Sequence, residues 1–283
     1  MPVKGRTVVI TGASGGIGFE AAVSIARMGA RVVLVSRPGE KATRACEEIR
    51  ARSQSVEVDL HVCDLSSMAA VRRLAGELRD RYRRLDVLIN NAGTVNQSRR
   101  ITAEGFELTF AVNHLSHFVL TTLLLDRLMA SAPSRIVHVS SAAHRGGDLD
   151  FDNLHYEHGG YSILSSYSRS KLANVLFSNE LARRLNGSGV TSNSVHPGGV
   201  VTNIWNRTPW WVQPILVFAK PFMLSAAEGA SRVVMVATSA EVEGRTGGYY
   251  ERNNLTETSP EASDRQLATR LWHASELMTA VRS

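Results

Sequence analysis

The sequence predicts an α/β protein built on a single, doubly wound parallel sheet of about seven strands, with helices on both faces. Short β-branched runs alternate with segments whose apolar residues recur every three or four positions, which is the pattern of βαβ units. The strand segments are continuously apolar, so both faces of the sheet are expected to be covered. A glycine-rich turn after the first strand favours an open, doubly wound sheet over a barrel.

The strand segments follow one another along most of the chain. Six are expected at residues 7–10, 31–36, 56–63, 86–90, 135–140 and 190–196, and a seventh at 247–251. Ser259 is the expected N-cap, and Pro260 the first residue, of a C-terminal helix over residues 260–280. No linker, repeat or low-complexity tract divides the chain, so residues 1–283 are expected to form one domain.

Composition narrows the class of protein. The chain has 283 residues, of which 43% are hydrophobic and 20% charged, an ordinary globular balance. Cys46 and Cys63 match neither a CxxC pair nor a disulfide-rich pattern, so we expect two buried thiols in a reducing, cytoplasmic environment. The first strand begins within six residues of the start, which leaves no room for a signal peptide.

The distribution of charged, apolar and histidine residues argues against a nucleic acid, a membrane or a metal ion as a partner. The net charge is +6, but the arginines occur in scattered pairs among acids, so nucleic-acid binding is not expected. No apolar run has the length of roughly 18 residues that a spanning helix needs, the nearest being the interrupted run 210–224. The histidines between residues 144 and 158 lack the spacing of metal ligands, and no metal site is expected.

The turn after the first strand carries a candidate nucleotide site. In "TGASGGIG", Gly12, Gly16 and Gly18 precede a helix. Glycines let the backbone approach a pyrophosphate, and the helix N-terminus offers free N–H groups. A plain strand-to-helix turn is the alternative, but the place after the first strand of a βαβ unit favours a dinucleotide.

The end of the second strand bears on the choice of dinucleotide. An NAD site places an acid about twenty residues beyond the glycines, whereas this chain has Ser36 and Arg37. Arg37, with Ser36 as a second donor, would hold a 2′-phosphate by charge-assisted hydrogen bonds, which favours NADP(H). The alternative is an exposed arginine that begins the loop before Pro38.

The stretch "YSILSSYSRSK" offers two phenols for chemistry. Tyr167 has Lys171 four residues later, on the same face of a helix, whereas Tyr161 has Ser165 at that spacing. A nearby ammonium favours the phenolate, so we expect Lys171 to lower the pKa of Tyr167 toward that of a general acid or base. The spacing alone is common by chance.

Taken together, these motifs resemble a known family. "TGASGGIG", "NNAG" at 90–93, "VNHL" at 112–115, "HVSS" at 138–141, "YSRSK" at 167–171 and "HPGGVVT" at 196–202 occur in the order of the short-chain dehydrogenases/reductases. The resemblance covers nearly the whole chain and is greatest to the retinol dehydrogenase branch and its bacterial relatives. It implies a Rossmann-type fold, a nicotinamide dinucleotide and interconversion of a carbonyl and an alcohol.

The resemblance also implies roles for individual residues. Tyr167 would be the proton donor or acceptor, Lys171 would lower its pKa, Ser141 rather than Ser140 would bond the substrate oxygen, and Asn113 would hold a water that relays protons. The cofactor would be NADP(H). Its expected binding residues are Gly12, Ser14, Gly15, Gly16, Ile17, Gly18, Ser36, Arg37, Asp64, Leu65, Asn91, Ala92, Gly93, Tyr167, Lys171, Pro197, Gly198, Val200 and Thr202.

The expected substrate is a lipophilic ketone, aldehyde or alcohol. Retinal-like aldehydes and polyketide-derived or polycyclic ketones compete, and a catalytically silent NADP-binding protein is a third alternative. Two departures from the family matter: the N-terminal hydrophobic anchor of membrane retinol dehydrogenases is not expected here, and Gly15 stands where a polar residue is usual.

Two segments are expected to shape the substrate site. Residues 203–224, rich in tryptophan and phenylalanine, would form an apolar lid, a packed hairpin in the core or at a subunit interface, or a membrane-surface contact, which we do not favour. Tyr161 would belong to the opposite wall. The resemblance further implies a homodimer or homotetramer built on the helix that carries Tyr167.

Overall fold

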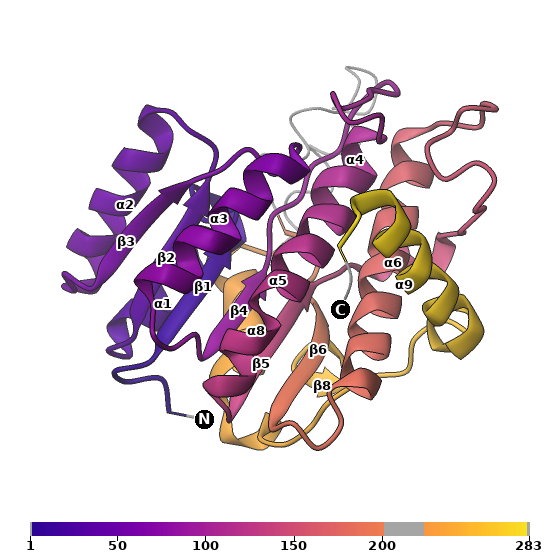
Figure 1. The fold of residues 1–283 in the computed structure, drawn as a ribbon. Coiled ribbons are helices and arrows are strands. Elements are labelled where there is room, and N and C mark those ends of the chain that lie inside the picture. Colours follow the sequence, from indigo (N-terminus) through magenta and orange to yellow (C-terminus); the bar gives the residue numbers. More distant parts are fainter. Residues whose placement is uncertain (1, 201–223, 282–283) are drawn as a thin grey trace.

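Eight strands form one sheet in the computed structural model, which describes residues 2–200 and 224–281 (Figure 1). The sheet order is β3-β2-β1-β4-β5-β6-β7-β8, and all pairs are parallel except the last. The strands are β1 (Thr7–Thr11), β2 (Arg31–Ser36), β3 (Val58–Val62), β4 (Val87–Asn90), β5 (Ser134–Val139), β6 (Val190–His196), β7 (Tyr249–Glu251) and β8 (Asn254–Leu255).

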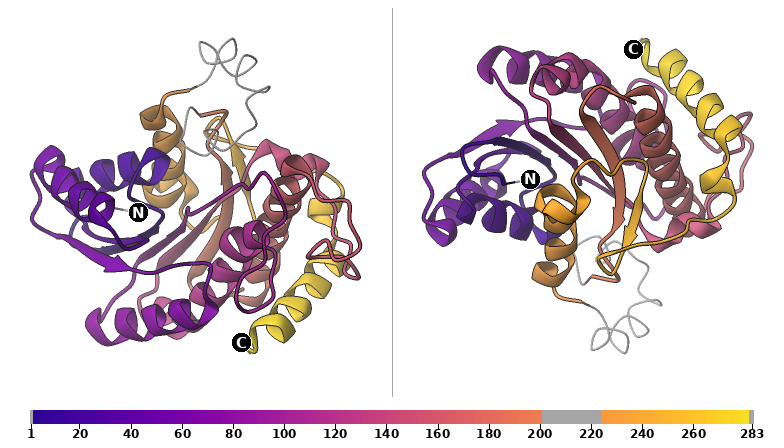
Figure 2. Two further views of the ribbon diagram at one scale, coloured as in Figure 1. Left: turned by 90° about the horizontal axis from the view of Figure 1, so that it is seen from above. Right: turned by 90° about the horizontal axis from the view of Figure 1, so that it is seen from below.

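Helices cover both faces of the sheet, as Figure 2 shows in the views from above and below. One layer holds α1 (Gly16–Arg27), α2 (Glu40–Ser53) and α8 (Ala226–Thr238). The other holds α3 (Met68–Arg81), α5 (Ser116–Ala130), α6 (Ile163–Arg184) and, outside α6, α9 (Arg265–Thr279). The predicted doubly wound α/β fold is therefore confirmed, and each face has its own hydrophobic core.

Three details differ from the sequence-based expectation. β3 is shorter than the predicted 56–63, since Val56 is 86% exposed and stands before the strand. β8 was not predicted, because two exposed residues carry no apolar pattern. The C-terminal helix begins at Arg265 with Asp264 as its N-cap, not at Pro260, because the Asp264 carboxylate accepts the N–H groups of Gln266 and Leu267.

The topology places a crevice at the carboxyl ends of the central strands. β1 pairs with β2 on one side and with β4 on the other, so the connections after β1 and after β4 run in opposite directions. This reversal is the switch point at which open α/β sheets bind ligands. The glycine turn after β1 and the "NNAG" segment after β4 both lie there.

A long apolar helical segment runs through the core behind this crevice. It comprises α4 (Leu108–Phe110), the π-helical η1 (Ala111–Leu115) and α5. Of the described residues, Leu108–Ala130 is the one helical stretch that is long and apolar enough to span a membrane, and 78% of its apolar window is buried inside the protein. Such burial is typical of a core helix. Cys46 and Cys63 are also buried, as predicted.

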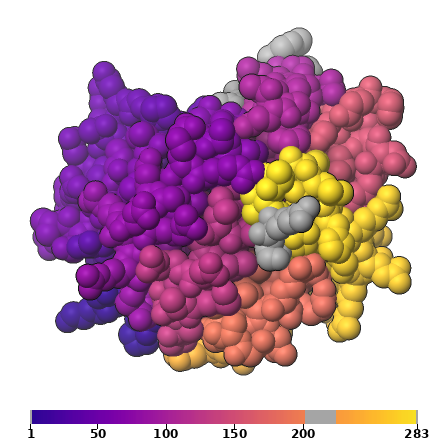
Figure 3. Space-filling model, viewed as in Figure 1, coloured from indigo at the N-terminus to yellow at the C-terminus, as the bar shows by residue number. Residues whose placement is uncertain are grey.

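Helix α9 lies on the outer side of α6, and the two are seen side by side in Figures 1 and 3. Trp272 is 2% exposed, and its ring packs against those of Phe118 and Phe177 at centroid distances of 5.1 and 5.6 Å. Arg184 of α6 stacks over the same indole at 4.1 Å. The chain's own C-terminal helix thus covers part of α6, and a dimer built on α6, which stays a prediction, has to use what α9 leaves open.

We expect Trp272→Ala to lower the free energy of unfolding by about 3–5 kcal/mol, because it removes a buried indole from the contact between α9, α5 and α6. Urea unfolding followed by circular dichroism measures the change. Leu277→Ala, on the same helix but 84% exposed, is the matched control and should change it by less than about 0.5 kcal/mol. Equal effects of the two substitutions would contradict this packing role.

Candidate active site

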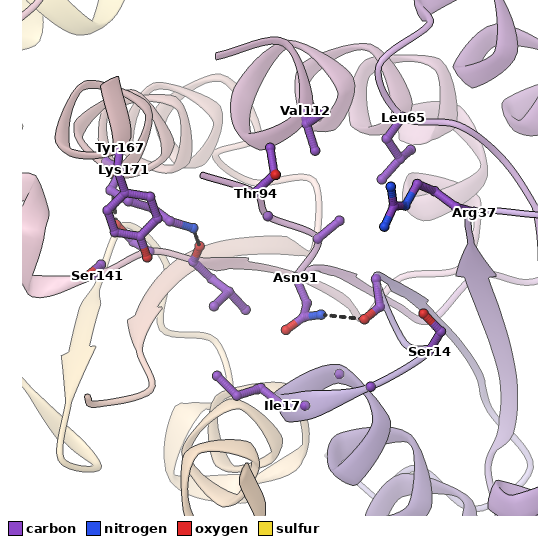
Figure 4. Close-up of a pocket in the computed structure, with 18 of the residues that line it drawn as sticks. Ser14, Ile17, Arg37, Leu65, Asn91, Thr94, Val112, Ser141, Tyr167 and Lys171 are labelled. Carbon is purple, nitrogen blue, oxygen red and sulfur yellow. Dashed lines mark hydrogen bonds between the residues drawn. The ribbon is translucent and has the colours of Figure 1, made fainter. Parts of the chain in front are cut away.

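A cavity of about 690 Å³ lies at the carboxyl ends of the strands and extends from the end of β2 to α6 (Figure 4). Arg37 and Tyr167 mark its two ends. Among the residues predicted for the site, the following line it: Gly12, Ser14, Gly15, Gly16, Ile17, Gly18, Ser36, Arg37, Asp64, Leu65, Asn91, Ala92, Gly93, Ser141, Tyr167, Lys171, Pro197, Gly198 and Val200. Thr202 and the expected lid, residues 203–224, lie outside the described residues apart from Leu224.

The glycine turn is packed directly against the "NNAG" segment. A Cβ on Gly12, whose φ is +71°, would lie 2.7 Å from the Cα of Ala92. A Cβ on Gly18 would lie 2.4 Å from the side-chain Nδ2 of Asn91. Helix α1 starts at Gly16 without a side-chain cap, so its first N–H groups face the cavity without a side-chain acceptor. This cradle has the shape and the donors that a pyrophosphate requires.

Thr11 holds the two segments together. Its hydroxyl oxygen accepts the backbone N–H groups of Asn91 at 2.9 Å and of Ala92 at 3.0 Å. The Asn91 side-chain amide donates back to the Thr11 carbonyl at 2.8 Å. These bonds fix the floor of the cavity between β1 and β4.

The end of β2 supplies the cationic part of the cavity. Ser36 is buried, whereas the exposed Arg37 points into the cavity opposite Ser14 (Figure 4). Two residues after the end of the neighbouring strand β3, Asp64 accepts hydrogen bonds from the backbone N–H and the hydroxyl of Ser66 at 3.0 and 2.9 Å. Lys41 also lines this end, and the sequence analysis did not identify it.

Ser141 and Tyr167 meet at the opposite end. Ser141 is the N-cap of the short helix η2 (Ala142–Gly146) and its hydroxyl accepts the Ala143 N–H at 3.2 Å, while Tyr167 lies in α6. Burial raises the pKa of Tyr167, and a hydrogen bond with Ser141 acts against that rise. Ser140 instead donates to the Lys171 carbonyl at 2.9 Å and is buried under the helix, so Ser141 is the serine whose side chain meets Tyr167.

Lys171 lies one turn after Tyr167, as the spacing predicts, but it acts differently from the expectation. Its Nζ donates to the Val139 carbonyl at 2.8 Å and stands 5.5 Å from the centre of the Tyr167 ring. Burial lowers the pKa of Lys171 to about 8. Burial raises the pKa of Tyr167 in this arrangement, and the lowering of that pKa by Lys171 stays a prediction.

Asn113, in the π-helical turn η1, lies beside Lys171 of helix α6. Its Oδ1 accepts the Thr94 N–H at 2.8 Å, and its Nδ2 donates to Ser170 Oγ at 2.9 Å. A Cβ on Gly93 would lie 3.7 Å from Asn113 Oδ1 and 3.8 Å from Lys171 Nζ, so the three residues adjoin. Glu107, fully buried, fixes the start of this segment by accepting the N–H groups of Thr109 and Phe110.

The loop after β6 closes the cavity on the side of α8. Pro197, Gly198 and Val200 line it. Gly198 has a φ of +100°, and a Cβ there would lie 2.5 Å from Leu224 and 2.6 Å from the Arg232 guanidinium. Glycine is therefore required at this position by both backbone conformation and space.

Some lining residues were missed, and one prediction needs correction. Tyr161 is not among the lining residues, because its hydroxyl donates to the Asn96 carbonyl at 2.7 Å and its ring packs on Tyr156. Leu164, 69% exposed and one helical turn before Tyr167, takes the wall position instead. The sequence could have indicated this, because Leu164 stands three residues before Tyr167 and so lies on the same face of the helix. Further lining residues are Thr94, Arg100, Ile101, Thr102, Leu108, Val112, Ala143 and His196.

The depressed pKa of Lys171 gives a pH-dependent stability. Between pH 8 and 10.5, the unfolded chain, with its ordinary lysine pKa of 10.5, binds more protons than the folded one, so this group makes stability rise with pH. Relative to Lys171→Met, the free energy of unfolding of the unaltered protein should rise by about 2 kcal/mol between pH 7 and 9.5. Urea unfolding at several pH values measures the difference, and a constant difference would contradict the depressed pKa.

Comparison with known proteins agrees with this geometry. A family model described as short chain dehydrogenase matches residues 6–212. Human retinol dehydrogenase 14 is 41% identical and retinol dehydrogenase 13 is 38% identical; both alignments cover 99% of this chain, and 88% and 86% of those proteins.

Solved structures show the same likeness. An uncharacterized protein from Mycobacterium paratuberculosis superposes with a TM-score of 0.81 at 34% identity, over 99% of this chain and 95% of that one. Pseudomonas aeruginosa RhlG, in an active-site complex with NADP, has a TM-score of 0.70 at 27% identity, over 88% and 96% of the two chains. The chain belongs to the short-chain dehydrogenase/reductase family and is an oxidoreductase related to the retinol dehydrogenases.

Proposed function

We propose that this protein is an NADP(H)-dependent oxidoreductase that interconverts a carbonyl and an alcohol on a lipophilic substrate, with Tyr167 as the general acid and base. The observation that carries the proposal is the pairing of Ser141 with Tyr167 at one end of a cavity whose other end presents Arg37. The family implies a nicotinamide dinucleotide.

The residues present fit such a cofactor. The glycine cradle offers helix N–H groups to a pyrophosphate, and Gly93 leaves open space beside Asn113 and Lys171, where a side chain would narrow the cavity. The end of β2 carries Arg37 and no acid, so a 2′-phosphate is accepted there in place of a free 2′-hydroxyl. When bound, the nicotinamide supplies or accepts the hydride.

The protein's own residues manage the substrate oxygen and the proton. Ser141 and the Tyr167 hydroxyl both donate toward a carbonyl oxygen placed between them, where negative charge develops during reduction. Tyr167 then gives up its proton to that oxygen, and its raised pKa keeps the phenol protonated at neutral pH for this step.

Lys171 and Asn113 lie next to the tyrosine's end of the cavity and would resupply its proton. The pKa of Lys171 is about 8, so its ammonium can lose and regain a proton near neutral pH. Lys171 and Asn113 both lie next to Gly93. We infer that Lys171 returns a proton toward Tyr167 after each reduction, with Asn113 holding the geometry. In the oxidative direction the same groups accept the alcohol proton.

A lipophilic substrate is supported by exposed apolar side chains in the lining of the cavity. Leu164 and Ile101 are large apolar side chains that are 69% and 43% exposed and yet line the cavity. A bound apolar molecule would cover this surface. Retinal-like aldehydes are the first substrates to test, because curated relatives at 38–41% identity are named retinol dehydrogenases. Polycyclic and polyketide-type ketones form the second group.

The direct test is a spectrophotometric assay of NADPH oxidation over lipophilic aldehydes and ketones, with NADH in parallel. Turnover with NADPH that exceeds turnover with NADH supports the proposal. A protein that binds NADPH but reduces none of these substrates would instead favour the catalytically silent alternative.

Tyr167→Phe should lower kcat by about 10²- to 10⁴-fold, because the variant keeps the ring but has no proton to transfer. Fluorescence titration with NADPH should give nearly the same Kd as in the unaltered protein. Near-normal turnover by this variant would refute the assigned role of Tyr167.

Leu164→Ser should lower kcat/KM for long-chain aldehydes by about tenfold through a higher KM, since it removes apolar surface from the wall. Short-chain aldehydes that do not reach the wall should be reduced as before. Leu255→Ser, equally apolar and 59% exposed but outside the cavity lining, is the matched control. An equal loss for short and long substrates would argue against a wall role.

A further inference from the structure

The main chain of Ser141 is held by His144. Ser141 lies two residues beyond the end of β5 at Val139. Its hydroxyl oxygen accepts the Ala143 N–H at 3.2 Å, and a hydroxyl that accepts this bond can still donate its own proton. Its carbonyl oxygen accepts two bonds from His144, one from the backbone N–H at 3.1 Å and one from the ring Nδ1 at 2.7 Å.

The second ring nitrogen of His144 contacts the C-terminal part of the chain. Its Nε2 lies 3.4 Å from the backbone nitrogen of Ser259, and its ring packs on that of Tyr249 in β7 with centroids 4.8 Å apart. The side chain of His144 is fully buried. The next residue, Arg145, forms an ion pair with Glu251 at 3.2 Å. The short helix η2 is thus tied to β7 and to the segment before α9.

The two partners of the His144 ring require one particular tautomer. A carbonyl only accepts a hydrogen bond and a backbone N–H only donates one, so Nδ1 carries the proton and Nε2 is bare. Burial lowers the pKa of His144, which keeps the ring uncharged at neutral pH. The Nδ1–H form therefore satisfies both ring nitrogens.

On its other side, η2 packs against the helix that carries Tyr167. A Cβ on Gly147, at the end of η2, would lie 2.6 Å from the Ser168 carbonyl oxygen and 2.8 Å from the Cβ of Leu172. The φ of Gly147 is −83°, so space, and not backbone conformation, requires glycine there. η2 therefore lies between α6 and the segment before α9, and the buried ring of His144 bonds it to that segment.

We propose that His144 is a positioning residue, which through Nδ1 fixes Ser141 where its hydroxyl and that of Tyr167 share the substrate oxygen. The bond to Ser259 would orient the ring so that Nδ1 meets the Ser141 carbonyl. This inference rests on the proposed function. It adds to the site a residue that is not among those lining the cavity.

Two amide side chains test the ring nitrogens separately. In His144→Asn the amide can take the place of Nδ1 and donate to the Ser141 carbonyl, whereas in His144→Gln it reaches the place of Nε2 and can accept the Ser259 N–H. We expect kcat to fall by about tenfold in His144→Gln and by less than about threefold in His144→Asn. The Kd of NADPH should be unchanged in both, because the glycine cradle lies at the other end of the cavity.

The two variants also control for stability. Each keeps one of the two ring bonds, so urea unfolding should show similar losses, and a difference in kcat then reports the position of Ser141. His61 is the matched control, because its ring nitrogens also contact two partners, Glu77 and Tyr82, outside the cavity lining. His61→Asn and His61→Gln should both keep the kcat of the unaltered protein.

A measurement on the unaltered protein tests the same bond without a variant. Long-range proton–nitrogen NMR should show His144 as the uncharged Nδ1–H tautomer at neutral pH. An Nε2–H tautomer or an imidazolium would overturn the bond from Nδ1 to the Ser141 carbonyl and, with it, the positioning role.

The outcomes separate this inference from the proposed function. An unaltered protein that reduces none of the carbonyl substrates would overturn the proposed function and, with it, the role of His144. An active protein in which His144→Asn and His144→Gln turn over equally would overturn the role of His144 alone.

Discussion

Two reciprocal hydrogen bonds between the end of β5 and helix α6 are the constraint on which the active site depends. Ser140 Oγ donates to the Lys171 carbonyl, and Lys171 Nζ donates to the Val139 carbonyl, at 2.9 and 2.8 Å. Both bonds are buried, so water does not compete with them and an unmade partner would be costly. They set α6 in register with β5, so that the next residue of β5's extension, Ser141, faces Tyr167.

The same arrangement explains the proton chemistry of the pair. Burial makes the neutral forms of both side chains more favourable, which raises the pKa of Tyr167 and lowers that of Lys171 to about 8. A general acid with a raised pKa stays protonated, and an ammonium with a lowered pKa exchanges its proton readily near neutral pH. In the proposed mechanism, burial of the two side chains, more than their mutual attraction, sets the pKa values with which they would transfer a proton.

At the other end of the cavity the electrostatics are of a different kind. Arg37 and Lys41 are exposed, so their attraction for a phosphate is screened by water and salt and is individually modest. The backbone at this end is fixed by the packing of the glycine turn on the "NNAG" segment, which Thr11 holds in place by hydrogen bonds. In the proposed function, the rigid backbone of the glycine turn would position the dinucleotide, and the exposed cations at this end would attract its phosphate.

The sequence by itself determined the alternation of strands and helices, the glycine cradle and the spacing of Tyr167 and Lys171. Each of these is a local pattern, since it involves residues that are close together along the chain. The choice of Ser141 over Ser140 came from the resemblance of the sequence to the family. Only the tertiary structure decided the contact between His144 and Ser259, the replacement of Tyr161 by Leu164 in the wall, and the direction of the Tyr167 pKa. Each of these three features depends on burial or on residues brought together across the fold, and none is encoded in the spacing of neighbours along the chain.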